Sequence, residues 1–178
     1  NSLTVVLFQE IERYNILIKV IHSTLRNCCK AIRGEVVMSI DASEVYHALL
    51  EQRVPRAWAD VAYPSMKPLN SWFKDLLEKV EFIKTWLKKG EPTCFWFPGF
   101  FFPQSFLTAV LQSHSRKHSL PIDKLSFEAI VVRQPPEQII HPPEDGAYIS
   151  GLYIDGAKWS QENWCVMDND TDVVYNTF

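Results

Sequence analysis

An amphipathic repeat of about seven helical turns near the start of the chain constrains the fold more than any other feature. Apolar residues recur there at alternating spacings of four and three, which places one set along one face of an α-helix: Leu7, Ile11, Tyr14, Ile18, Ile21, Leu25, Cys28 and Ile32. Gly34 follows as a stop signal. Because Val6, Leu17 and Val20 widen the apolar stripe, we favour a helix packed on more than one neighbour over a free coiled coil.

A second, shorter helix is predicted after residue 40. Asp41, with Glu44 three residues later, resembles a capping box in which Asp41 is the N-cap. The Val54-Pro55 pair ends the segment. The side of this helix that we expect to face the core carries Val45, Ala48 and Leu49.

A third helix repeats the four-three rhythm. It ends at Lys88-Lys89, where cations favour the helix dipole, and Gly90 lies just beyond. Its predicted apolar face consists of Leu69, Phe73, Leu76, Val80, Ile83 and Leu87. The linker at 55–68 is interrupted by prolines but holds Trp58 and Tyr63, so we expect it to be ordered and packed on the bundle.

After Pro92 the pattern changes. Residues 94–97 read as an aromatic strand, a Pro-Gly turn follows, and a helix is predicted over about 104–117. The residues of this helix that we expect to point inward are Phe106, Leu107, Val110 and Leu111.

In the last third of the chain the period becomes two. Residues 125–131 alternate as a half-buried strand does, and a Pro-rich loop at 134–145 separates them from a second predicted strand at 147–154. Gly151 indicates a bulge and Asp155-Gly156 a turn. The predicted fold class is therefore α+β: a helical bundle followed by a partial antiparallel, barrel-like β portion, which needs further strands or a partner surface because an isolated strand pair is marginal.

Charge and hydropathy exclude two classes of partner. The net charge is -3, with 18 basic residues scattered among 21 acidic ones, which gives no basic field for nucleic acid or an anionic membrane. The longest apolar stretch, 94–102, is short and broken by Pro and Gly, and no signal peptide opens the chain. Four cysteines without a Cys-x-x-Cys pair indicate reduced thiols, so we expect a cytosolic location.

The sequence contains no motif that grips a nucleotide. Neither a Gly-x-x-x-x-Gly-Lys-Ser/Thr loop nor a Gly-x-Gly-x-x-Gly turn is present. No Gly-x-Ser-x-Gly elbow selects a serine for Ser-His-acid catalysis. We therefore predict that this segment is not an enzyme and holds no catalytic, cofactor-binding or metal-ligating residue.

The histidines are the nearest approach to a metal site. His114 and His118 lie four apart on a predicted helix, a spacing that can present two imidazoles to one ion. The residues between them are partly cationic and the sequence indicates no third ligand, so we favour a structural role. His22, His47 and His141 are solitary, and we expect each to be a satisfied or exposed side chain.

Two other groups have alternative interpretations. Cys28 and Cys29 lie on the first helix, one toward the core and one on its flank, and core filling explains them better than redox chemistry. The aromatic run at 95–102 could stack on bases or bind a proline-rich peptide. Without a basic patch, a core or domain-interface role is favoured.

These same segments resemble the C-terminal region of dynein heavy chains, in the order in which that family has them. The resemblance extends from Gln9 to Trp159, and the stretches that carry it are 9–15 (Gln-Glu-Ile-Glu-Arg-Tyr-Asn), 67–69 with Ser71-Trp72, Trp96 with 99–108 (Gly-Phe-Phe-Phe-Pro-Gln-Ser-Phe-Leu-Thr), 121–127 and 151–159. The 99–108 stretch is more similar to axonemal than to cytoplasmic members.

The resemblance implies a parent protein that is an ATP-driven, minus-end-directed microtubule motor with a ring of six AAA+ modules. Residues 1–90 would form a helical bundle adjoining the sixth module, and 91–178 would begin the C-terminal domain, with further strands expected beyond residue 178. The ATP and magnesium sites would lie upstream of this segment. The implied partners are the ring modules, and, through the parent, microtubules and dynein intermediate and light chains; the implied location is the cytoplasm, cytoskeleton and ciliary axoneme.

Both ends of the sequence read as cuts: the start lacks an initiator Met, and 173–178 is an apolar, strand-like run. Three alternatives stay open at this point. They are a free-standing helical interaction module, a segment of cytoplasmic dynein, and a hydrolase with an unrecognised site.

Overall fold

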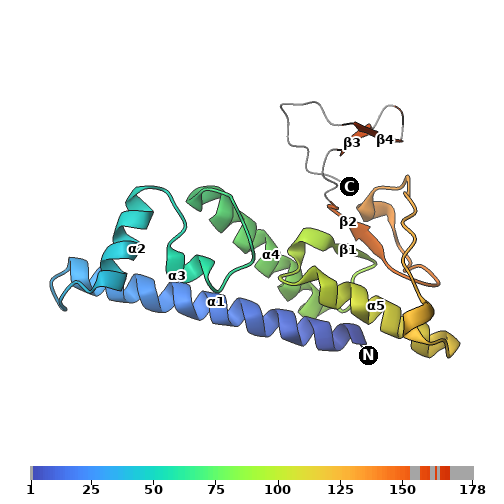
Figure 1. Cartoon of the computed structure of the whole chain (residues 1–178), viewed down its shortest axis with the longest axis horizontal. Coiled ribbons are helices and arrows are strands. Elements are labelled where there is room, and N and C mark those ends of the chain that lie inside the picture. Colours follow the sequence, from blue (N-terminus) through green and yellow to red (C-terminus); the bar gives the residue numbers. More distant parts are fainter. Residues whose placement is uncertain (1, 153–156, 161–162, 164, 169–178) are drawn as a thin grey trace. The chain divides into compact units, whose positions relative to one another are not determined.

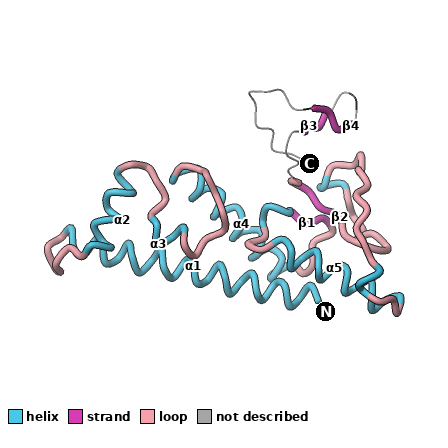
Figure 2. Tube along the Cα trace, viewed as in Figure 1, coloured by secondary structure: helices cyan, strands magenta, loops and turns pink. Residues whose placement is uncertain are grey.

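The computed structural model describes residues 2–152, 157–160, 163 and 165–168. The chain divides into two compact units, which we call the helical unit (Leu7–Lys84) and the aromatic unit (Asn1–Val6 with Thr85–Phe178). Figure 1 gives the order of the elements along the chain, and Figure 2 shows that helices form most of it. The units are defined by packing, so the family-based domain division at residue 90 stays a prediction.

The first predicted helix is α1, Ser2–Ile32. Its end is the predicted one: Gly34 has a φ of 75°, and the Glu35 N–H donates to the Lys30 carbonyl at 3.0 Å, a pairing typical of a glycine-capped helix. The long amphipathic repeat therefore predicts both the existence and the end of this helix.

The buried stripe of α1 lies to one side of the predicted one. Leu7, Tyr14, Ile21 and Cys28 are buried as predicted. Ile18 and Ile32 are 41% and 58% exposed, whereas Leu17 and Glu10 are fully buried. The spacing of the apolar residues does not decide which side of the stripe is buried. In the structure the buried side is the one that carries Glu10.

The second helix, α2 (Ile40–Leu50), has a different N-cap from the predicted one. The Ser39 side chain accepts a hydrogen bond from the Ala42 N–H at 3.1 Å, and Asp41 lies in the first turn. Ser39 has an extended backbone (φ -75°, ψ 164°), which aims its hydroxyl at this N–H group. The assignment of Asp41 as N-cap is therefore wrong by two residues.

The linker between α2 and the next long helix is ordered, as predicted. It contains α3, Arg56–Ala59, and both of its large aromatics, Trp58 and Tyr63, are buried at 2% and 7% exposure. Each stacks on Trp72, with ring centroids 6.0 and 6.2 Å apart. The Trp58 Nε1–H donates to Thr24 Oγ1 at 2.8 Å and so ties the linker to α1.

The third predicted helix is α4, Leu69–Lys89. Leu76 and Ile83 are buried as predicted, but Phe73 and Leu87 are 43% and 58% exposed. Trp72, Asp75, Lys79 and Trp86 occupy the buried face instead. Because two of these four residues are charged, an apolar pattern could not identify this face.

The aromatic run forms the core of the aromatic unit. It contains β1 (Cys94–Trp96) and the 3-10 turn η1 (Phe97–Gly99), and it leads into α5 (Pro103–His118). Phe95, Phe100 and Phe106 are buried, with ring centroids 4.6 to 6.3 Å apart, and Trp86 meets Phe95 edge to face at 5.3 Å. The predicted core role is confirmed for Phe95 and Phe100, whereas the other aromatics of the run are half-buried or, at Phe102, exposed. Phe106 and Val110 point inward as predicted, and Leu107 and Leu111 are half-buried.

The β portion differs from the prediction. β1 pairs with β2 (Tyr148–Ser150) in parallel, not antiparallel, with Cys94 opposite Tyr148. β3 (Ala157–Ser160) and β4 (Cys165–Asp168) form a separate antiparallel pair. The described strands therefore make two two-stranded sheets and no barrel.

The strand predicted at 125–131 is wrong. This segment is irregular and mostly exposed, between the short turns η2 (Ile122–Lys124) and η3 (Pro136–Gln138). Alternation is necessary for a half-buried strand, but the strand forms only where another edge supplies hydrogen bonds. The predicted Asp155-Gly156 turn and the run at 173–178 lie outside the described residues.

Gly151 follows the end of β2 with a φ of 76°, so it terminates the strand instead of forming the predicted bulge within it. A Cβ at this position would lie 2.8 Å from Pro98 Cδ. No helix within the described ranges is long and apolar enough to span a bilayer.

Candidate functional site

The last two turns of α5 bring together the two histidines that the sequence places at metal-ligand spacing. His114 and His118 lie one turn apart, with ring centroids 4.3 Å from each other. The helix ends at Ser119, which has a left-handed φ of 55°. The Ser115 hydroxyl donates to the Leu120 carbonyl at 2.6 Å and fixes the turn that leaves the helix.

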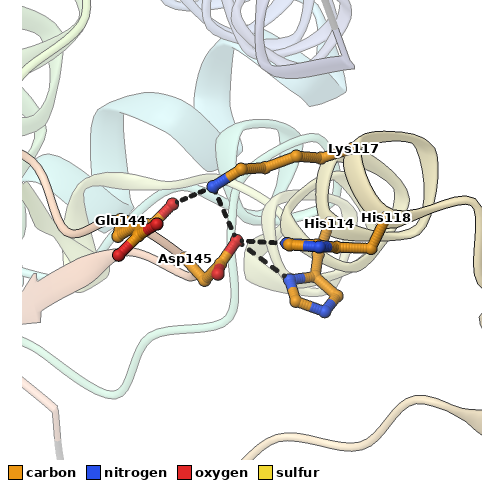
Figure 3. Close-up of polar contacts among 5 residues, drawn as sticks. All are labelled: His114, Lys117, His118, Glu144 and Asp145. Atoms are coloured by element: carbon orange, nitrogen blue, oxygen red, sulfur yellow. Dashed lines mark hydrogen bonds and ion pairs between the residues drawn. The ribbon is translucent and has the colours of Figure 1, made fainter.

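Asp145, on the loop before β2, completes the cluster (Figure 3). Its Oδ1 lies 3.2 Å from His114 Nδ1 and 2.9 Å from His118 Nε2. Lys117 Nζ lies 3.0 Å from the same oxygen and donates to the Glu144 carbonyl at 2.6 Å. We call His114, His118 and Asp145 the His-His-Asp cluster.

The charge of the cluster is set by the carboxylate. The hydrogen bond from His118, followed by the one from Lys117, lowers the pKa of Asp145 well below its ordinary value of 3.8. An ionised carboxylate only accepts hydrogen bonds. The ring nitrogens that face Asp145, Nδ1 of His114 and Nε2 of His118, are therefore donors in this arrangement.

Sequence reasoning finds the two histidines but misses the third member. Asp145 lies 31 residues after His114, in a Pro-rich loop whose path no local pattern predicts. The preference for a structural role of the histidines rested partly on the lack of a third ligand, and the fold supplies one. Among the described residues, these three are the group whose ligand atoms could hold a metal ion, all within 4.8 Å of one another.

The cluster does not reproduce Ser-His-acid chemistry. An acid is joined to both histidines, but the serine between them, Ser115, directs its hydroxyl to the Leu120 carbonyl. Lys117 adds a cation to the same carboxylate oxygen. The arrangement can clamp a loop or hold an ion, and it does not present an activated hydroxyl.

A second cluster lies inside the helical unit. Asp75 of α4 accepts a hydrogen bond from Lys67 at 2.8 Å and pairs with Lys79 at 3.6 Å. The side chains of Asp75 and Lys79 are 11% and 7% exposed. Lys79 Nζ also lies 4.5 Å from the centre of the Tyr63 ring, a cation–π geometry. We call this group, with Glu10 and Tyr14 of α1, the buried ionic network.

Burial dominates the titration of this network. Loss of solvation lowers the pKa of Lys79, against the opposing attraction of Asp75. Burial likewise raises the pKa values of Tyr14 and Tyr63 well above 10, helped by the charges of Glu10 and Asp75 respectively. Glu10 itself pairs with Arg13 at 3.6 Å. Lys67 and Tyr63 of the linker contact Asp75 and Lys79 of α4, and the charge of Glu10 in α1 acts on Lys79, so the network has a structural role.

The other histidines and the paired cysteines lie apart from both clusters in sequence. His22 lies beside Arg26 at 3.5 Å, the His47 ring meets Tyr46 edge to face at 5.5 Å, and His141 is exposed. Cys28 is buried and Cys29 exposed, as the two sides of the helix predict.

The chain therefore combines a helical unit that contains buried charged residues with a second unit that has an aromatic core and short strands, and together they define a mostly helical α+β protein. The family model for the C-terminal domain of dynein heavy chains matches residues 1–178. This protein belongs to that family.

Several relatives are axonemal or flagellar heavy chains. Dynein axonemal heavy chain 6 of Homo sapiens is 42% identical over 94% of this chain and 4% of its own length. Dynein axonemal heavy chain 12 of Rattus norvegicus is 42% identical over 98% of this chain and 6% of its own length. The Dynein-1-beta heavy chain of the flagellar inner arm I1 complex of Chlamydomonas reinhardtii is 44% identical over 94% of this chain and 4% of its own length. The chain thus spans a small fraction of each relative.

Proposed function

We propose that this chain is the C-terminal region of an axonemal dynein heavy chain and serves as a non-catalytic brace in an ATP-driven, minus-end-directed microtubule motor. The axonemal names of the relatives support the dynein type and a place in the ciliary or flagellar axoneme. The observation that carries the mechanical role is the buried ionic network, because it joins the linker to α4 and includes the charge of Glu10 in α1, which acts on Lys79 of α4.

Charged groups in a protein interior give a pairing of helices one specific register. Removing one partner of a buried pair leaves an uncompensated charge, so sliding of α4 past the linker would be costly. Lys67 and Tyr63 of the linker reach the same α4 residues, Asp75 and Lys79. A unit fastened in this way transmits displacement as a rigid body.

The surface of α1 offers a place for a neighbour. Phe8 and Ile16, both on the helical-unit part of α1, are 63% and 48% exposed, and a neighbouring domain would cover these apolar side chains. In the complete heavy chain we assign this surface to contact with an AAA+ ring module. Residues 1–90 would adjoin the sixth module, and 91–178 would begin the C-terminal domain.

In this proposal the segment breaks no bond. ATP and magnesium would bind in the upstream part of the heavy chain, and contacts with microtubules and with intermediate and light chains would come through the rest of the motor. The support is the lack of any nucleotide-gripping motif in the sequence.

The test uses the complete heavy chain. We expect the double substitution Phe8→Ser/Ile16→Ser to lower microtubule gliding velocity while basal ATP hydrolysis is retained, because a loosened brace uncouples motion from hydrolysis. Lys19→Gln, an exposed polar change on the same helix, is the matched control and should leave both unchanged. Normal gliding by the double variant would contradict the proposal.

A further inference from the structure

We propose that the His-His-Asp cluster is a zinc-binding site that fastens the loop before β2 to the end of α5. His114 Nδ1, His118 Nε2 and Asp145 Oδ1 would be the three protein ligands, with water as the fourth. This inference is independent of the proposed motor function, since it concerns a clamp within the aromatic unit.

The distances suit a tetrahedral ion. Zinc bonds to nitrogen and oxygen of about 2.0–2.2 Å imply ligand atoms separated by about 3.3–3.6 Å along a tetrahedral edge. The two measured edges at Asp145 Oδ1 are 2.9 and 3.2 Å, and all three ligand atoms lie within 4.8 Å of one another. Small side-chain rotations would therefore admit an ion between them.

The ligand chemistry favours zinc over the hard cations. Two imidazoles and one carboxylate form a borderline N/N/O set, whereas magnesium and calcium prefer oxygen ligands. An ordinary aspartate is ionised across the neutral range, so it binds an ion without first releasing a proton.

Binding needs one rearrangement of protons. The nitrogens that now donate to Asp145 must present lone pairs to the metal, so each of them would first give up its proton to solvent. His114 and His118 are 30% and 38% exposed, so solvent reaches both rings.

Lys117 opposes the ion. Its ammonium group lies 3.0 Å from the oxygen that the metal would use. On binding it would leave Asp145 and could keep its hydrogen bond to the Glu144 carbonyl. Removing this cation should therefore strengthen zinc binding, which is the reverse of what structural damage would do.

The first experiment titrates the chelator-stripped 178-residue protein with zinc sulfate in a calorimeter. We expect one saturable ion per molecule. His118→Asn and Asp145→Asn should each weaken binding more than about 100-fold, since even loss of an outer partner of a metal ligand costs about 10–100-fold. His141→Asn, an exposed histidine of the same loop region, is the control and should bind as the parent does. Absent saturable binding, or parent-like affinity in both cluster variants, would overturn the site.

Two further measurements test the placement of the ion. Lys117→Met should bind zinc roughly fivefold more tightly, as expected for removing a like charge at a solvent-exposed site; an unchanged or weaker affinity would contradict this placement. Cobalt substituted for zinc should give tetrahedral d–d bands, and a thiolate charge-transfer band would move the ion to a cysteine and overturn the proposal.

Discussion

Gly151, directly after β2, shows how a single residue limits what the chain can accept next to the β1–β2 pair. Its φ of 76° is unfavourable for any side chain, and an added Cβ would lie 2.8 Å from the Pro98 ring. Gly146 has a similar φ of 83° but open space around its Cα. The two glycines therefore separate the effect of backbone conformation from that of a steric clash.

We predict that Gly146→Ala lowers the free energy of unfolding by about 1–2 kcal/mol, the backbone cost alone. Gly151→Ala should lower it by about 1–3 kcal/mol more, because the new methyl group overpacks against Pro98. Urea denaturation followed by circular dichroism measures both. Equal losses in the two variants would show that the Pro98 contact is unimportant.

Asp145 and Ser39 show what the sequence could not predict at this scale. The histidine spacing is visible in the sequence, but Asp145 joins the pair only because a 27-residue excursion returns to His118. Ser39 is easily overlooked as N-cap because Asp41 and Glu44 make an equally good local pattern. Both errors come from judging single residues without their neighbours in space.

At the scale of elements, the buried ionic network is the feature with the largest expected energetic effect. Asp75→Asn should lower the free energy of unfolding by about 3–5 kcal/mol, because it leaves the Lys79 ammonium buried beside a neutral amide. Glu78→Gln is the control: its pairing with Lys74 is exposed and 3.9 Å long, so a change within about 0.5 kcal/mol is expected. Thermal or urea unfolding of both variants provides the measurement. A small effect of Asp75→Asn would mean that the network does not fasten the helices.

The buried tyrosine of α1 predicts a decline of stability in alkali. Burial raises the pKa of Tyr14 above its ordinary value of 10.0. Above pH 10 the unfolded protein therefore loses a proton that the folded protein keeps, and stability falls by about 1.4 kcal/mol per pH unit for this group. The raised pKa of Tyr63 acts in the same direction.

Lys79 acts in the opposite direction at lower pH. Because the pKa of Lys79 is lowered, the folded protein binds fewer protons than the unfolded protein at pH values between the lowered pKa and 10.5. In that range the free energy of unfolding rises with pH, and above it Lys79 adds no further pH dependence. Urea curves above about pH 10.5 isolate the tyrosine effect. Tyr14→Phe should flatten the decline there, and an unaltered slope would contradict this explanation.

The helices are predictable as elements, but their buried faces are predicted less well. Continuous four-three spacing identifies α1 and α4, because periodicity and end signals agree over many turns. The observed buried faces of α1 and α4 differ from the predicted ones because they include Glu10, Asp75 and Lys79. A prediction from apolar residues assigns such charged residues to the surface. The prediction of a strand at 125–131 is wrong for a different reason, because a strand forms only where the edge of another strand in the fold pairs with it.

For the whole molecule, the family is recognisable from the ordered motifs alone. Such motifs combine many residues over most of the sequence, so they are far more specific than any single pattern, and the family match over residues 1–178 agrees with them. The two units, one with a buried ionic network and one with a core of packed phenylalanines, suit the domain that we propose to transmit force. A part in mechanical coupling is the role that we propose for this segment.

The most direct test deletes residues 1–90 of this segment from the complete heavy chain and measures ATP hydrolysis and microtubule gliding on the same preparation. We predict that hydrolysis persists while gliding velocity falls, because the ring still turns over nucleotide without its brace. Unchanged hydrolysis together with unchanged velocity would contradict the role of a brace.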